Sequence, residues 1–157
     1  MSETIHNDDR LTQIALDLLE ALISTPSFSK EEDKTAQLLA EALAAQGIEA
    51  ERLGYNVFAR NRFFDADKPT ILLNSHHDTV KPNPQYTRDP FTPIAEDGKL
   101  YGLGSNDAGG CLVSLLAVFI HYYERNDLRY NLLFAATAEE EISGTGGGNG
   151  LARTSVR

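Results

Sequence analysis

The sequence predicts an α/β fold, a three-layer sandwich in which helices pack on a largely parallel β-sheet. Two helical stretches come first along the chain, and short strand-like stretches follow them. A long apolar helix then separates the last two apolar strands. Parallel strands need such a crossover connection, so this order favours a parallel pair. The 157 residues suffice for one domain with a substantial core.

Two helices are predicted in the first third of the chain. Apolar residues recur at helical spacing over 11–23. Pro26 ends this helix, because the residue before a proline disfavours the helical region. Ser29 and Glu32 have the spacing of a capping box, which predicts a second helix that runs to Gly47.

The periodicity changes after the second helix. Alternation of apolar and polar residues predicts two short strands, and two continuous apolar runs predict strands that are buried on both faces. The alternating strands are expected at 48–53 and 55–60, and the buried strands at 70–74 and 130–137. These strands belong to the predicted, largely parallel sheet.

A loop, a turn and a helix are expected between the two buried strands. Four prolines predict an irregular loop over 81–93, and a turn at 97–98 precedes a short strand at 99–103. The helix expected over 111–125 is apolar around most of its circumference, so we expect it to be buried. Cys111 at its start is expected to pack in the core.

Composition argues against several classes of function. The net charge is −9, with 23 acidic and 14 basic residues, which argues against nucleic acid and anionic membranes as partners. No apolar run is long enough for a transmembrane helix, and residues 1–10 are polar and acidic, unlike a signal peptide. The single cysteine excludes an internal disulfide, so a cytoplasmic location is expected.

Three polar segments lie at strand ends or at a helix start, where α/β sheets gather their ligands. They are SHHDT at 75–79, GLGSNDAGG at 102–110 and AEEE at 138–141. Each has an ordinary explanation by itself, namely a polar strand end, an N-cap with turn glycines, or a solvated charge run. Together they supply His, Asp and Glu, the ligands of zinc and similar divalent ions, and so predict a metal site.

The segments LLNSHHDTVKP, YGLGSNDAGG and TAEEEISG resemble the M20 metallopeptidase family, and the resemblance runs from about Leu11 to Gly144. That family includes acetylornithine deacetylases, succinyl-diaminopimelate desuccinylases and related peptidases. SHHDTVKP and GSNDAGG are most similar to the acetylornithine deacetylase branch. The resemblance implies a zinc-exopeptidase-like catalytic domain that removes an N-acyl group from a small amino-acid substrate, in arginine biosynthesis.

The resemblance also implies roles for five residues. His76 would bind one metal ion, and Asp78 would orient the His76 imidazole. Asp107 would bridge two ions and Glu141 would bind the other. Glu140 would act as general base, taking a proton from water that the ions activate. No separate cofactor-binding residues are implied.

Two further expectations follow from the resemblance. The metal ions would be zinc, with cobalt or manganese as alternatives because they accept the same ligands. The peptide bond after the bridging aspartate is cis in this family, so we predict a cis bond between Asp107 and Ala108.

The family's catalytic domain continues with another carboxylate ligand, a final His ligand and a lid domain that dimerises. No Asp, Glu or His follows Glu141 in this sequence, and 145–157 form a glycine-rich tail that does not resemble the family. We therefore expect 11–144 to be a partial catalytic domain, from a truncated or frame-shifted product or a gene fragment, inactive alone.

Other functions stay open. The chain is alternatively a non-catalytic metal-binding or interaction module, or a desuccinylase or dipeptidase of the same family. A nucleotide-binding domain has less support, because neither a P-loop lysine nor a full GxGxxG is present.

Overall fold

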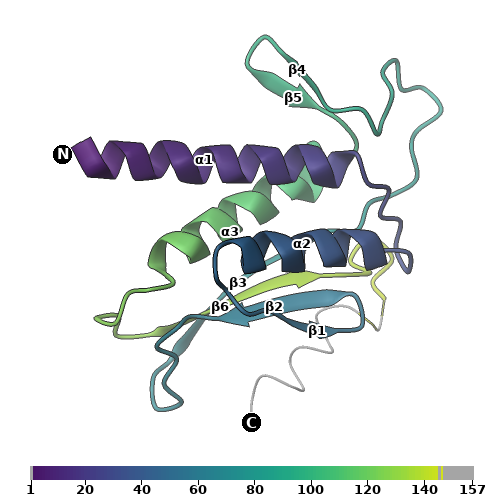
Figure 1. The fold of residues 1–157 in the computed structure, drawn as a ribbon. Helices are drawn as coiled ribbons and strands as arrows, with labels where there is room; N and C mark the ends of the chain where they lie inside the picture. The colour runs from purple at the N-terminus through teal and green to yellow at the C-terminus, as the bar shows by residue number, and fades with distance from the viewer. Residues whose placement is uncertain (1, 145, 147–157) are drawn as a thin grey trace.

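The computed structural model describes residues 2–144 and residue 146, with side chains described from residue 8 onward (Figure 1). The predicted tail at 145–157 lies outside the described residues except for Gly146. The elements, in chain order, are α1 (Ser2–Ile23), α2 (Asp33–Ala45), β1 (Glu51–Leu53), β2 (Asn56–Arg60), β3 (Thr70–His76), β4 (Ile94–Glu96), β5 (Lys99–Tyr101), the helical turn η1 (Ser105–Gly110), α3 (Cys111–Tyr122) and β6 (Asn131–Thr137).

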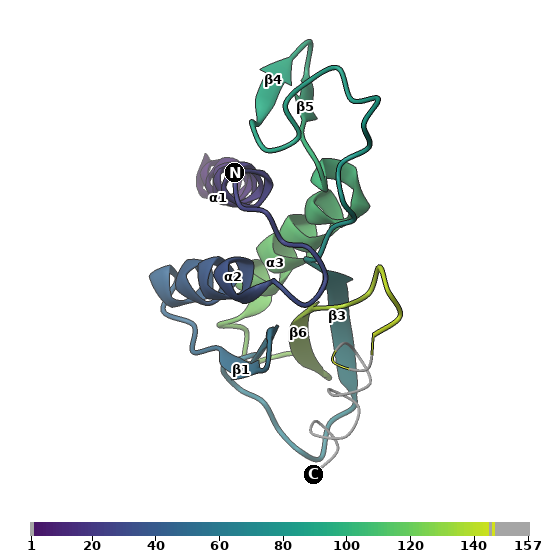
Figure 2. The same cartoon turned by 90° about the vertical axis from the view of Figure 1, so that its right-hand side faces the viewer.

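The described helices lie on one face of a four-stranded sheet. Helices α2 and α3 pack against the strands, and α1 lies across α3 and α2 on the side away from the sheet (Figures 1 and 2). The β4–β5 hairpin projects beyond α1, away from the sheet. The predicted α/β fold is confirmed, and two of its three expected layers lie in the described part of the chain.

The sheet has the order β1-β2-β6-β3 and is mixed. The β1–β2 and β2–β6 pairs are antiparallel, whereas β3 and β6 are parallel, with His76 opposite Thr137 at their ends. Helix α3 belongs to the crossover connection that leads from β3 to β6, as parallel pairing requires. The carboxyl ends of β3 and β6 therefore meet at one edge of the sheet.

The core lies between β6 and the helices. Every residue of β6 is buried, as its apolar sequence predicts. On the helix side, the Phe134 ring lies 5.8 Å from the Phe119 ring of α3, and neither side chain is exposed. On the opposite face, Phe58, Leu133 and Ala135 form a smaller buried cluster. This packing fixes the position of the β6 carboxyl end.

Strand β3 differs from its prediction. An apolar run suggests burial on both faces, but Ile71 and Leu72 are 43% and 53% exposed. Among the described residues, β6 is the one strand that pairs with β3, so β3 lies at an edge. Only its last residue, His76, is buried.

Several element boundaries also differ. Helix α1 begins at Ser2, so it includes most of the polar segment that precedes the predicted helix at 11–23. Strand β1 covers only Glu51–Leu53, and β4 is a strand within a segment for which no strand is predicted. These short strands form only antiparallel pairs with their sequence neighbours, and such local pairing leaves little periodicity to detect.

Helix α3 is buried along one side only. Leu112, Leu116 and Phe119 are fully buried, but Val118 is 44% exposed. Cys111 is exposed, so the prediction that it packs in the core is wrong. It occupies the first position of α3 on the outer side, where nothing in the described chain covers it. None of the described helices combines the length and the apolar character that a membrane crossing needs.

Candidate metal centre

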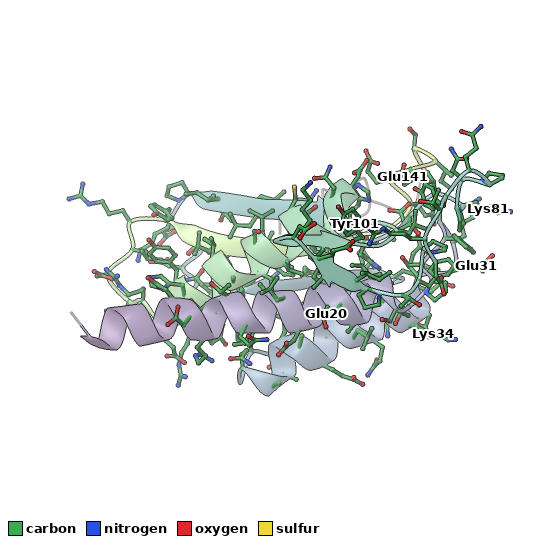
Figure 3. The ribbon with its side chains drawn as sticks, turned by 90° about the horizontal axis from the view of Figure 1, so that it is seen from above. Glu20, Glu31, Lys34, Lys81, Tyr101 and Glu141 are labelled. Atoms are coloured by element: carbon green, nitrogen blue, oxygen red, sulfur yellow. The ribbon has the colours of Figure 1, made fainter. Side chains whose placement is uncertain are left out.

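The three polar segments converge at the carboxyl ends of β3 and β6. His76 is the last residue of β3, and Asp78 follows it by two residues. Asp107 lies in η1, just before α3, while Glu140 and Glu141 lie in the turn after β6. Figure 3 shows Glu141 at the same end of the molecule as Lys81. Lys81 lies in the loop that follows Asp78.

His76, Asp107 and Glu141 each present a ligand atom, and these three atoms lie within 4.8 Å of one another. The His76 Nε2 atom is 3.1 Å from Asp107 Oδ1 and 3.8 Å from Glu140 Oε2. The His76 side chain is largely buried, whereas the Asp107 and Glu140 side chains are 77% and 60% exposed. The cluster therefore joins a fixed imidazole to carboxylates that remain open to solvent.

The Asp78 carboxylate connects His76 to the turn that carries Glu140 and Glu141. This carboxylate, which is fully buried, lies 3.3 Å from His76 Nδ1 and accepts a hydrogen bond from Ser29 Oγ at 2.7 Å. It also accepts hydrogen bonds from the backbone N–H groups of Glu140 and Glu141. Burial alone would raise the Asp78 pKa, but these hydrogen bonds outweigh it and lower the pKa to about 2.

The same contacts set the charge of His76. The hydrogen bond to Asp78 raises the His76 pKa to about 9 against the opposing effect of burial, and Asp107 adds to the increase. Burial and the nearby Asp107 carboxylate raise the pKa of Glu141. A cation in this cluster would offset the mutual repulsion that raises the Glu141 pKa.

His77, which we assign no role in the site, points away from the cluster. Its Nδ1 atom is 2.9 Å from Thr35 Oγ1, and its Nε2 atom is 3.0 Å from the Tyr55 carbonyl oxygen. Burial lowers the His77 pKa to about 4, so the ring is neutral near pH 7. His77 joins α2 to the strands rather than contributing a ligand.

The predicted capping box at Ser29 and Glu32 is wrong. Helix α2 begins at Asp33, and its N-cap residue Glu32 makes no side-chain capping bond. The two side chains instead reach the site, Ser29 to Asp78 and Glu32 to the backbone N–H of Glu139. Sequence reasoning missed the role of these two residues at the site. Their spacing is typical of a local helix cap, and it carries no sign of these long-range hydrogen bonds.

The η1 turn holds Asp107 in place. The Asp107–Ala108 peptide bond is cis, as predicted. Gly109 permits close packing, because a Cβ atom there would lie 2.7 Å from both the Gly104 carbonyl oxygen and the Leu19 side chain. The Gly109 N–H donates to that same Gly104 oxygen, which closes the turn. Asp107 therefore projects from a tightly packed backbone.

Comparison with family models identifies the family of the chain. Residues 72–156, more than half of the chain, match the family model described as peptidase family M20/M25/M40. The chain belongs to this family. The match includes all three polar segments, and it extends through the glycine-rich segment to residue 156.

Two curated relatives are similar in sequence. A succinyl-diaminopimelate desuccinylase of Delftia acidovorans is 31% identical over 137 residues, which is 80% of this chain and 36% of the relative. The desuccinylase of Beijerinckia indica is 31% identical over 150 residues, which is 86% of this chain and 38% of the relative. The chain thus spans little more than a third of the length of these relatives.

Solved structures share the fold. An M20 family metallo-carboxypeptidase from Sulfolobus solfataricus is 27% identical with a TM-score of 0.69, over 82% of this chain and 31% of that protein. A dinuclear metal-binding M20 peptidase from Bacillus subtilis is 19% identical with a TM-score of 0.69, over 95% of this chain and 40% of that protein. The M20 hydrolase fold therefore extends over nearly the whole chain.

Proposed function

We propose that this chain supplies the metal site and the general base of an amide hydrolase that removes an N-acyl group from an amino acid. The observation that carries the proposal is the meeting of His76, Asp107 and Glu141 within 4.8 Å at one sheet edge. Membership of the M20 family adds that these residues belong to a hydrolase fold. Because the chain covers 36% and 38% of the two curated relatives, the activity of the whole protein is part of the proposal.

The residues of the cluster fit a divalent cation. Ligand atoms around one zinc ion lie about 3–4 Å apart, so small side-chain rotations would bring these three atoms into range. Among the described residues, Asp107 and Glu140 form ion pairs with no cationic group other than His76. His76, Asp107 and Glu141 would hold the metal, with Asp107 shared between two ions and zinc as the proposed metal. A bound divalent ion supplies Lewis acidity, which polarises a carbonyl group and activates water.

Asp78 and Glu140 have distinct parts in this proposal. Asp78 accepts from His76 Nδ1 and so turns Nε2 toward the ligand cluster. Glu140 is not a member of the three-ligand group, but its Oε2 lies 3.8 Å from His76 Nε2 and its side chain is exposed. In this proposal Glu140 would take a proton from the attacking water and would deliver it to the departing amine.

The acyl group distinguishes two candidate substrates. The SHHDTVKP and GSNDAGG segments favour an acetylated amino acid such as acetylornithine. The names of both curated relatives instead favour a succinylated amino acid as the second candidate. Both substrates carry the same scissile amide, so the site residues serve either reaction.

An amine-release assay tests the function. The complete gene product, loaded with zinc, should release free α-amine from N-acetyl-L-ornithine or from N-succinyl-L,L-diaminopimelate. We expect Glu140→Gln to lower kcat at least about a hundredfold, because it removes the base but keeps the volume.

The matched control is Glu139→Gln, since Glu139 is the neighbouring acid without a place in the ligand cluster. Metal content is measured in parallel for all three proteins. An unchanged kcat in Glu140→Gln at full metal content would overturn the role of Glu140. A wild-type protein that hydrolyses neither substrate would overturn the proposed activity.

A further inference from the structure

Side-chain acceptors hold the start of the turn that carries Glu140 and Glu141. The four residues that directly follow β6 each donate their backbone N–H to a side-chain oxygen. Ala138 donates to Asn56 Oδ1 at 3.1 Å, and Glu139 donates to Glu32 Oε1 at 3.0 Å. The next two donate to Asp78, from Glu140 to Oδ1 at 3.1 Å and from Glu141 to Oδ2 at 3.2 Å.

Glu32 is the unexpected acceptor in this set. It lies at the end of the α1–α2 connection, and it is completely buried. No ion pair neutralises its carboxyl group among the described residues, and its Oε2 atom has no hydrogen-bond partner there. Burying such a group is unfavourable unless specific contacts offset it, and the hydrogen bond from the Glu139 N–H is one of them, beside the backbone of Lys30 and of Glu32 itself.

Glu139 is the residue at which the chain changes direction. Its φ angle is +56°, in the left-handed region that residues other than glycine rarely adopt. Its carbonyl oxygen accepts from the Gly144 N–H at 2.8 Å, which closes the turn. A hydrogen bond to the Glu139 N–H therefore acts at the point that sets where Glu140 and Glu141 project.

The α1–α2 connection, which includes Glu32, also contacts the residues that follow β3. The Thr79 N–H donates to the Ser27 carbonyl oxygen at 2.8 Å, and Phe28 forms a parallel bridge with Thr79. Ser29 donates to Asp78. One segment before α2 thus touches both the His76–Asp78 segment and the glutamate turn.

We propose that Glu32 is a positioning residue, whose hydrogen bond to the Glu139 N–H holds Glu140 and Glu141 in register with His76 and Asp107. This inference rests on the proposed function, because it assigns Glu32 an effect on the metal ligand Glu141. Glu32 does not touch the metal or the substrate. It acts with Asn56 and Asp78 as the acceptor set that shapes the turn.

Zinc titration by calorimetry, with cobalt absorption spectra, tests the proposal on the 157-residue chain. Glu32→Leu removes the acceptor but fills similar space, and we expect it to weaken zinc affinity about tenfold or more. The d–d absorption of bound Co²⁺ should change as the ligand set is disturbed. Glu32→Gln keeps a carbonyl oxygen for the Glu139 N–H, so its affinity should stay within about threefold of wild type.

The matched control is Glu31→Leu, because Glu31 is exposed on the outer surface at the same end of the molecule (Figure 3). Its zinc affinity and its cobalt spectrum should equal those of the wild type. If folded Glu32→Leu binds zinc as tightly as Glu31→Leu, the positioning role is overturned. If the wild-type chain binds no zinc, the proposed metal site fails, and the amide measurement below still decides the role of Glu32.

Amide hydrogen exchange in the wild-type chain keeps the test independent of variant folding and of metal. The hydrogen bond to Glu32 predicts that the Glu139 amide exchanges at least about tenfold more slowly than in an unfolded peptide of the same sequence. Exchange of Glu139 at the unfolded rate, while Glu140 and Glu141 are protected, would overturn the proposal.

Discussion

Asp78 shows how one buried carboxylate organises a site at the scale of a single residue. Its two oxygens accept from Ser29 and from two backbone N–H groups, and they also face the His76 ring. Such a carboxylate is stabilised as an anion, which is why the Asp78 pKa falls to about 2 despite burial. An amide group at this position would bring its NH₂ group against hydrogen-bond donors.

Asp78→Asn should therefore destabilise the fold and weaken metal binding together. We expect the free energy of unfolding to fall by about 2 kcal/mol or more, because buried donors lose their acceptor. Zinc affinity should fall about 10–100-fold, as is usual when the partner of a metal-binding histidine is removed. Urea unfolding and zinc calorimetry measure the two effects.

The control for this change is Asp127→Asn, since Asp127 forms an exposed ion pair with Arg125. It should alter neither measurement. Unchanged stability and unchanged zinc affinity in Asp78→Asn would contradict the anchoring role of Asp78.

At the scale of elements, β3 and β6 form a parallel pair with very different surroundings. Strand β6 is buried along its whole length between antiparallel β2 and parallel β3. Strand β3 is exposed until it reaches His76. The rigidity of the site therefore comes from β6 and its packing on α3, and β3 contributes position through its register with β6.

The variants Phe134→Ala and Leu72→Ala test this difference between the two strands. Phe134 is fully buried against Phe119, so its truncation should lower the free energy of unfolding by about 3–5 kcal/mol. Leu72 is 53% exposed on the neighbouring strand, and its truncation should lower that free energy by less than about 1 kcal/mol. Equal losses in the two variants, measured by urea unfolding, would contradict the buried position of β6.

At the scale of the whole molecule, the sequence was sufficient for the α/β class and for the elements that carry the site. Long periodic or continuous apolar stretches predicted α3 and β6, because burial requires those patterns. The convergence of the three polar segments follows from parallel pairing of β3 with β6, and the sequence predicts that pairing through the crossover helix.

Other features depend on contacts that a local pattern does not encode. The exposure of Ile71 and Leu72 depends on how many neighbours β3 has, and the apolar run carries no such information. Glu32 and Ser29 fit a local cap equally well, and only the fold brings them against residues far along the chain. The supporting residues of the site are therefore the part that sequence reasoning missed.

Zinc titration of the chain and its ligand variants tests the central claim most directly, namely that His76, Asp107 and Glu141 form a metal site. The wild type should bind zinc at least about a hundredfold more tightly than His76→Ala, Asp107→Ala or Glu141→Ala. His121→Ala, at the far end of α3 from Asp107, should bind as the wild type does. Equal zinc affinity in the wild type and all three ligand variants would contradict the account.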